Sequence, residues 1–251
     1  MVPKAIAKTG KVTVGMDATF PPMGFVSDNG KSIIGAEADL AKALGQVIGL
    51  KLTIKQQPFA AILPRVERND YALGLSAITD TKEREQQVNM VTYFSAGTSF
   101  YTAAKGGTQI SGIDGICGVS VAVVNGTLPA ADVRAQDAKC RELGRSPVKI
   151  VPLKEQAEHI QAVESGKVEV GLFDSPVVAY IVSKSEGKLI HTGEPYGEAP
   201  YGIAVSKSSN MTPVVLAAMK SLVANGQYAA ILKEWGLSDG AISEPKVNDG
   251  S

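Results

Sequence analysis

The chain has 251 residues, 44% of them hydrophobic, and its 25 basic side chains balance its 25 acidic ones. This length and apolar content allow one large globular unit or two modest lobes around buried cores, and they exclude a disordered chain. The balanced charge excludes a global field that would attract nucleic acid or an anionic membrane, so small molecules and other proteins are the expected partners.

Strand-like runs alternate with helix-like segments along the whole chain. The pattern predicts, in order, strand 11–17, helix 36–49, strand 51–57, helix 62–69, strand 71–77, strand 119–125, helix 129–143, strand 148–153, helix 155–166, strand 168–174 and a helical stretch 212–235. The last stretch carries apolar residues at helical spacing. This alternation predicts an α/β fold with mostly parallel sheets.

Two segments in different halves of the chain resemble each other. Ile62–Ser76 has the sequence ILPRVERNDYALGLS, and Ile160–Asp174 has IQAVESGKVEVGLFD. The similarity is either chance within a single sheet or the mark of two copies of one helix-turn-strand plan. In the second case Ser76 and Asp174 both follow the carboxyl end of a strand, where open sheets bind ligands, and a cleft between two lobes is the expected site.

The sequence lacks the common catalytic signatures. It contains no GxGxxG after a strand, no GxxxxGK[ST], no HExxH and no complete nucleophile elbow around Ser76. His159 and His191 are the only histidines, and they lack the neighbouring spacing of a metal site, so we expect both on the surface. We therefore predict no catalytic residue, no metal and no cofactor.

Cys117 and Cys140 are the only cysteines. The residues alone leave two alternatives, a pair of buried free thiols or a disulfide, and a disulfide would indicate an oxidising compartment. No apolar run approaches the roughly 20 residues of a membrane-spanning helix. The start of the chain, MVPKAIAKTGK, lacks the apolar core of a secretory signal, so we expect either a cytosolic protein or one whose leader has been removed.

Two charged residues suit the two ends of an amino acid, Arg84 for the carboxylate and Asp174 for the ammonium. Asp80 and Glu83 predict a capping box, which would place Arg84 in a first helical turn beside free N–H groups, where a bidentate pair with a carboxylate fits. The alternative is a solvated helix arginine. Asp174 ends an apolar strand and is the N-cap of a helix, an anion at a ligand site, or both.

The sequence Asn125-Gly126-Thr127 predicts a turn from a strand into a helix. Its backbone N–H groups could bind a carboxylate, and the alternative is an ordinary capped turn.

Several segments have a characteristic order and spacing: VTVGMDATFPPMGF, GAEADLAKALG, PFAAILPRVERNDYALGLSAITDTKEREQQVNMVTYFSAGTSFY, VAVVNGTL, VGLFDSPVVAY, PYGIAVSK and NGQYAAILKEWG. Together they resemble the type 3 family of extracellular solute-binding proteins, the polar amino-acid receptors of ABC importers, over nearly the whole chain. The resemblance implies a two-lobed periplasmic-binding-protein fold of type II, the Venus flytrap. Each lobe would have a mixed, mostly parallel sheet with flanking helices.

The resemblance also implies which residues bind the charged ends of an amino acid. Arg84 would clamp the carboxylate, with assistance from Thr79 and from the backbone at Thr127 and Leu128. Asp174 would hold the ammonium, in agreement with the pairing inferred from the residues alone.

A second group of residues would surround the rest of the ligand. By resemblance to the family, Phe20 and Phe59 would pack on it, Asp17 would lie near its side-chain end, and Ser76 and Ala77 would line the same wall. Aromatic packing there would exclude water and strengthen the charge pairs.

Departures from the family pattern bear on specificity. GAEADLA replaces the common GFDVDLA, and Glu37 is not expected to be a ligand because this segment usually supports the fold. Val124 and Phe173 stand where the glutamine receptor has polar contacts, which argues against a glutamine-specific pocket. Asp17 would repel an acidic ligand and suit a cationic or hydrogen-bond-donating side chain.

The resemblance predicts the organisation and location of the protein. One lobe would comprise 1–103 and 199–251 and the other 104–198, with hinges near 102–107 and 194–201. The cysteine pair matches a subset of the family, which favours a Cys117–Cys140 disulfide. The protein would be periplasmic or extracellular, with a lipid anchor in the precursor as an open alternative.

The predicted function is that of the extracytoplasmic substrate-binding component of an amino-acid ABC importer. As a monomer it would bind a free L-amino acid in the interlobe cleft, close on it, present it to a membrane permease and catalyse nothing. One alternative is a cyclohexadienyl-dehydratase-like enzyme, whose only evident general acid, Asp174, would be occupied by the ligand ammonium. Another is the sensor domain of a receptor, which would be flanked by membrane helices.

Overall fold

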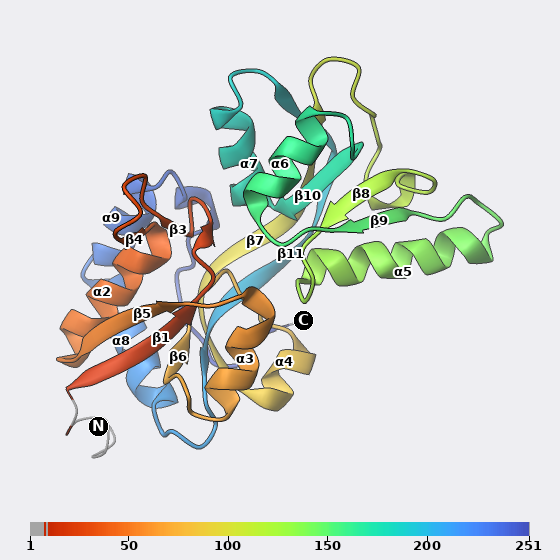
Figure 1. The fold of residues 1–251 in the computed structure, drawn as a ribbon. Helices are drawn as coiled ribbons and strands as arrows, with labels where there is room; N and C mark the ends of the chain where they lie inside the picture. Colours follow the sequence, from red (N-terminus) through yellow and green to blue (C-terminus); the bar gives the residue numbers. More distant parts are fainter. Residues whose placement is uncertain (1–7, 9, 251) are drawn as a thin grey trace. The chain divides into compact units, whose positions relative to one another are not determined.

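The computed structural model describes residue 8 and residues 10–250, and the chain divides into two compact units. The first unit comprises the described residues up to Ser95 and those from Ala199 onward, and the second comprises Ala96–Glu198. Two long strands, β7 (Asn89–Ala103) and β11 (Leu189–Val205), each contain one of these boundaries (Figure 1). The expected lobe limits and hinges stay predictions, and most of MVPKAIAKTGK lies outside the described residues.

The first unit contains a mixed sheet with the strand order β5–β1–β6–β11. β1 pairs in parallel with β5 and β6, and β11 pairs antiparallel with β6. A small separate sheet joins β2, β3 and β4. The bounds of these strands are β1 Lys11–Met16, β2 Thr19–Phe20, β3 Gly24–Val26, β4 Ile33–Ile34, β5 Lys51–Gln56 and β6 Leu73–Gly74.

Two glycines allow helix α3 (Phe59–Glu67) to pack directly on this sheet. Gly15 of β1 and Gly74 of β6 are paired neighbours. A Cβ atom at Gly15 would lie 2.9 Å from the Tyr71 ring, and one at Gly74 would lie 2.7 Å from the Ile62 side chain. A larger residue at Gly74 would therefore push α3 away from the sheet, and one at Gly15 would displace Tyr71, which follows α3.

The remaining helices of the first unit form two groups. Helices α2, α8 and α9 contact one another, and α4 lies against α3. Their bounds are α2 Ala36–Ile48, α4 Lys82–Gln87, α8 Thr212–Ala224 and α9 Gln227–Glu234, and a short 3-10 helix η2 spans Ser238–Gly240. α2 ends where Gly49 adopts a left-handed conformation with φ of 76° and its N–H donates to the carbonyl of Gly45.

Among the described residues, no single helix has both the length and the apolar character needed to cross a membrane, and only the bent pair α8 and α9, taken together, meets that test.

The second unit contains a sheet with the strand order β7–β10–β8–β9. β10 pairs in parallel with β8, β8 pairs in parallel with β9, and β7 runs antiparallel to β10. The bounds here are η1 Ile113–Gly115, β8 Ser120–Val123, α5 Leu128–Glu142, β9 Lys149–Pro152, α6 Gln156–Glu164, β10 Val170–Asp174 and α7 Ser175–Lys184. The predicted α/β class with mixed, mostly parallel sheets is confirmed.

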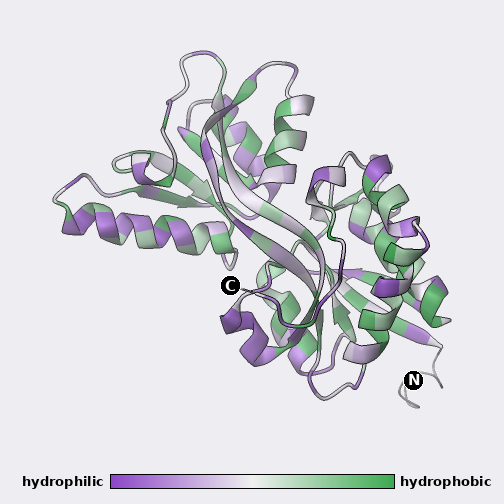
Figure 2. Ribbon diagram, turned by 180° about the vertical axis from the view of Figure 1, so that it is seen from behind, coloured by the Kyte–Doolittle hydropathy of each residue, from purple (hydrophilic) through white to green (hydrophobic). Residues whose placement is uncertain are grey.

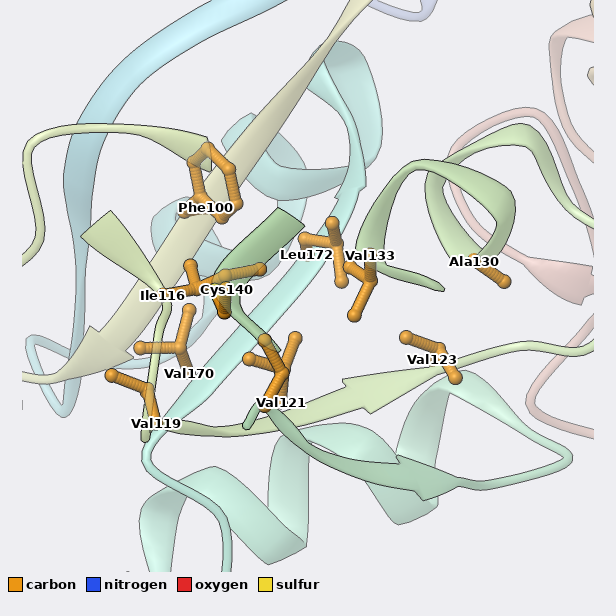
Figure 3. Close-up of a cluster of buried hydrophobic side chains, with 11 residues drawn as sticks. Phe100, Ile116, Val119, Val121, Val123, Ala130, Val133, Cys140, Val170 and Leu172 are labelled. Atoms are coloured by element: carbon orange, nitrogen blue, oxygen red, sulfur yellow. The ribbon is translucent and has the colours of Figure 1, made fainter. Parts of the chain in front are cut away.

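The core of the second unit lies between its sheet and α5. Figure 3 shows Val121, Val170 and Leu172 of the strands beside Val133 and Cys140 of the helix, all buried. Hydrophilic and hydrophobic bands alternate along α5 in Figure 2, as expected for a helix that buries one face and exposes the other.

A disulfide joins Cys117 to Cys140 in this core, with a Cα–Cα distance of 5.7 Å. It ties the segment after η1 to the second half of α5. The disulfide favoured by the family resemblance is therefore confirmed, and the alternative of two free thiols is wrong.

Replacing both cysteines by alanine should destabilise the second unit by about 3 kcal/mol, the loop-closure entropy that such a crosslink removes from the unfolded chain. The bridge spans 23 positions of sequence. Urea unfolding of oxidised wild type and of the double variant measures the difference. Reduced wild type is the matched control, since it should match the variant; equal stability of all three forms would contradict the prediction.

Candidate functional site

Arg84 lies half-buried in the first turn of α4. Thr81 is the N-cap of this helix, and its hydroxyl accepts a hydrogen bond from the Arg84 backbone N–H at 3.3 Å. The predicted capping box of Asp80 and Glu83 is therefore wrong. Asp80 lies one position too early to cap α4, and it is fully buried instead.

The Arg84 guanidinium is held by two further contacts. Its Nη1 donates to the backbone carbonyl of Thr79 at 2.8 Å, and its central carbon lies 5.6 Å from the centre of the Phe59 ring. Such a cation over an aromatic face is attracted by the ring quadrupole. These contacts argue against a freely solvated helix arginine.

Asp17 follows β1 and is only 8% exposed. Its Oδ1 accepts from the Thr19 hydroxyl at 2.8 Å, and its Oδ2 accepts from the backbone N–H of Phe59 at 3.0 Å. Its own N–H donates to Oγ of Ser76 at 3.0 Å. Asp17 thus joins β1 to the start of α3 and to the segment after β6. We call Asp17, Phe59, Ser76, Thr79 and Arg84 the Arg84 cluster.

Ala77, beside this cluster, has an unusual backbone conformation with φ of 47°. A non-glycine residue in this region is strained and needs support from its surroundings. The support comes from Glu37, which is 1% exposed and whose Oε1 accepts from the Ala77 N–H at 2.6 Å and from the Tyr93 hydroxyl. Glu37 therefore supports the backbone next to the cluster.

Phe20, the second aromatic residue expected on the ligand, lies half-buried in β2. It follows Thr19, whose hydroxyl binds Asp17. The chain connects Phe20 to the Arg84 cluster in this way, and its contact with a ligand stays a prediction.

In the second unit, Thr127 caps the 15-residue helix α5. Its hydroxyl donates to the carbonyl of Val124 at 2.7 Å and accepts from the N–H of Ala130 at 3.3 Å. Leu128 is the first helical residue and is half-buried. The predicted capped turn is confirmed. The helix N-terminus that it starts carries partial positive charge, which favours a carboxylate nearby.

Asp174 is the last residue of β10 and the N-cap residue of α7, but its side chain makes no capping hydrogen bond to that helix. Asp174 is therefore the N-cap residue, as predicted, although its carboxylate does not cap the helix through a hydrogen bond. Asp174 pairs with Thr98 of β7. Because side chains alternate along a strand, it shares a face with Leu172, which packs in the core under α5.

Two polar residues beside Asp174 were not found from the sequence. Tyr196 of β11 donates its hydroxyl to Oδ2 of Asp132 in α5 at 3.1 Å, and its ring stacks on Phe100 with the ring centres 5.6 Å apart. Burial, together with the negative charges of Asp132 and Asp174, raises the pKa of the Tyr196 phenol. We call Thr98, Asp132, Asp174 and Tyr196 the Asp174 cluster.

Neither of these missed residues carries a strong sequence signal. Asp132 lies one turn into a helix that was already predicted, where an acidic residue is common. Tyr196 lies in a segment that the family resemblance predicts to be a hinge. Only the position of Asp132 close to the predicted Thr127 turn could have drawn attention to it.

The structure buries one of the two histidines. The expected surface position of the histidines is wrong for His159, which is fully buried in α6 with its ring centre 4.8 Å from that of Phe173, and His191 is exposed. Burial lowers the pKa of His159 from 6.5 to about 4. The ring is therefore neutral in the folded protein at pH 7.

Acid should destabilise the protein through His159. Between pH 6.5 and about 4 the unfolded chain protonates this side chain and the folded chain does not, so the contribution to stability is lost as pH falls through that window. The loss should reach about 3 kcal/mol. Urea unfolding of wild type and His159→Gln at pH 7 and pH 4.5 measures it, with His191→Gln as the control. A variant as acid-sensitive as wild type would contradict this assignment.

Within residue 8 and residues 10–250, no three His, Cys, Asp or Glu side chains are grouped so that they could hold a metal ion.

Known proteins are similar to this chain over most of its length. The family described as "Bacterial extracellular solute-binding proteins, family 3" matches residues 12–238. The arginine-binding protein ArgT of Corynebacterium glutamicum is 34% identical over 250 residues, which cover 99% of this chain and 82% of that protein.

Solved structures are similar over nearly the same length. An ancestral arginine-binding protein bound to arginine has a TM-score of 0.81 and 30% identity, covering 90% of this chain and 98% of that one. The ancestral amino acid-binding protein AncCDT-1, a precursor of cyclohexadienyl dehydratase, has a TM-score of 0.82 and 26% identity, covering 92% and 97%.

Proposed function

Because this chain belongs to family 3 of the bacterial extracellular solute-binding proteins, we propose that it is the substrate-binding component of an amino-acid ABC importer and that its ligand is arginine. The observation that carries the choice of ligand is the Arg84 cluster, in which the Arg84 guanidinium lies over the ring of Phe59 and the Asp17 carboxylate accepts from the backbone N–H of the same residue. An α-amino acid with a cationic side chain presents the complementary pair of charges. The likeness to two arginine-binding proteins supports the same choice.

Each charged group would bind a different part of the ligand. Arg84 pairs with the ligand carboxylate, and the Phe59 ring packs on the aliphatic part of the ligand. Asp17 binds the cationic end of the side chain. Asp174 binds the α-ammonium, and the positive end of α5 at Thr127 assists the carboxylate. Arg84 belongs to the first unit and Asp174 to the second.

The proposal includes an extracytoplasmic location and a membrane permease as partner. The family description and the Cys117–Cys140 disulfide support the location, because disulfides persist in oxidising compartments. A free amino acid would be bound there and transferred to the permease without chemical change.

An enzymatic function is the weaker candidate. The likeness to a precursor of cyclohexadienyl dehydratase is the one observation in its favour, and that precursor is itself named as an amino acid-binding protein. Asp174 would have to act as a general acid, which conflicts with a role as the ammonium partner.

Arg84→Ala should weaken arginine binding by at least about 30-fold, because truncating one partner of a desolvated charge pair costs about 2–5 kcal/mol. Asp174→Ala should have a similar effect. Calorimetric titration of protein that has been unfolded and refolded, to remove carried-over ligand, measures the affinities. Arg68→Ala is the control, since that arginine forms an exposed ion pair with Asp70. If the wild-type protein binds none of the proteinogenic amino acids, the proposed function is wrong.

Asp17→Asn should lower the preference for arginine over glutamine by about tenfold, because it removes the charge that attracts the ligand guanidinium. The asparagine keeps an oxygen for the Phe59 amide, so the fold should be retained. The ratio of the two dissociation constants is the quantity to measure. Asp28→Asn removes an equal charge from an exposed position and should leave the ratio unchanged. An unchanged ratio in Asp17→Asn would remove Asp17 from the side-chain site.

A further inference from the structure

The last described residues of the chain, Lys246–Gly250, form a tail that adds to strand β7. The Thr92 N–H donates to the carbonyl of Lys246 at 2.9 Å, and the Asn248 N–H donates to the carbonyl of Met90 at 2.9 Å. The side-chain oxygen of Asn248 also accepts a hydrogen bond from the Met90 N–H at 2.8 Å. The tail is therefore paired in register with the part of β7 that follows α4.

Beyond Asn248 the tail turns toward the start of α4. Asn248 has a left-handed backbone with φ of 55°. The next two amides then donate to carboxylates, Asp249 to Oδ2 of Asp80 at 3.0 Å and Gly250 to Oε1 of Glu85 at 3.0 Å. Gly250 approaches so closely that a Cβ atom there would lie 2.6 Å from the backbone of Asp80. Only glycine fits this position without displacing the tail.

The two carboxylates that hold the tail lie on either side of Arg84 in the sequence. Asp80 is fully buried, and its N–H donates to the carbonyl of Pro200 at 2.7 Å. Thr79, which precedes it, accepts the hydrogen bond from the Arg84 guanidinium. Movement of Asp80 would therefore carry with it the carbonyl that orients Arg84.

The charges around Asp80 set the strength of this attachment. Burial, followed by the charge of Glu85, raises the pKa of Asp80 to about 7. Lys82 pairs with Glu85 at 3.2 Å, Lys246 pairs with the Asp249 side chain at 3.2 Å, and Lys207 donates to the carbonyl of Gln86. On β11, Tyr201 forms an antiparallel bridge with Thr79, and its phenol is the titratable group on that strand beside the segment.

We propose that the tail Lys246–Gly250 is a positioning element for Arg84, which keeps the segment Thr79–Glu85 in the conformation that binds the ligand carboxylate. The inference rests on the proposed function of Arg84. It assigns to the end of the chain a role in ligand affinity that goes beyond packing.

The first test is Gly250→Ala, whose added methyl group must displace the end of the tail from Asp80. Arginine affinity should fall by about tenfold, the equivalent of one lost hydrogen bond to a charged group. In the ligand-free protein, hydrogen exchange of the Arg84 amide should accelerate by a similar factor. Glu244→Gln, an exposed position just before the tail, is the control for both. Unchanged affinity and exchange in Gly250→Ala would overturn the proposal.

The second test is the pH profile of Asp80→Asn, because a purely structural role of the tail would not move it. In the ordered segment Asp80 keeps its proton up to about pH 7, whereas in an opened segment it would ionise from its ordinary value of 3.8. As pH rises from about 5 to about 7, arginine affinity should therefore fall and Arg84 exchange, corrected for its intrinsic rate, should rise, with no further change above about pH 7. Asparagine accepts from the Asp249 amide at every pH, so both slopes should disappear. Slopes equal to those of wild type would overturn the proposal.

The exchange measurement separates this inference from the proposed function. If wild type binds no amino acid, the proposed function fails. Exchange at Arg84 in Gly250→Ala then still decides whether the tail orders this segment, since that readout needs no ligand.

Discussion

The backbone between β6 and α4 lies outside any regular sheet or helix, and its need for hydrogen-bond partners determines much of the arrangement of the first unit. A buried N–H or C=O group without a partner costs free energy comparable to a lost hydrogen bond. The N–H of Leu75 donates to Gly15, that of Ala77 to Glu37 and that of Asp80 to Pro200. These partners come from strand β1, helix α2 and strand β11, so several distant parts of the chain hold one short segment. A segment restrained in this way can carry the strained conformation of Ala77 and present Arg84 in one orientation.

The second unit positions its polar groups by regular structure instead. Asp174 lies at the end of a strand and Thr127 at the start of a helix, and the core under α5 fixes both elements (Figure 3). This arrangement places negative charge in a partly desolvated region. Burial and the charges of Asp132 and Asp174 together raise the pKa of the Tyr196 phenol. Burial also raises the pKa of Asp132, and a cation bound beside Asp174 would favour the charged form of nearby carboxylates. The cluster is therefore better suited to an ammonium group than to a neutral or anionic one.

Much of the fold could be predicted from the sequence because periodicity and turn residues are local signals. The alternation of strands and helices, the capped turn at Thr127 and the place of Arg84 in a first helical turn all depend on neighbours in the chain. The errors concern contacts between residues far apart in sequence. Asp80 is buried and accepts from the distant amide of Asp249 instead of capping α4, and the buried ring of His159 packs on Phe173. No local pattern could show that Tyr196 would reach Asp132, since the two are joined only by the packing of β11 against α5.

The hydrogen bonds of Asp17 in the fold bear on its proposed role in specificity. Its oxygens accept from the Phe59 amide and the Thr19 hydroxyl, so the carboxylate is oriented by the fold before any ligand arrives. An anion oriented in advance needs no further ordering when a cation binds, and it opposes an acidic side chain by the same charge. The same hydrogen bonds limit how specificity can change. A side chain at position 17 without an acceptor would leave the first amide of α3 without a partner, and Phe59, which packs on Arg84, would lose its support. Under the proposed role of Asp17, a change toward neutral ligands would have to remove its charge while keeping one of its oxygens.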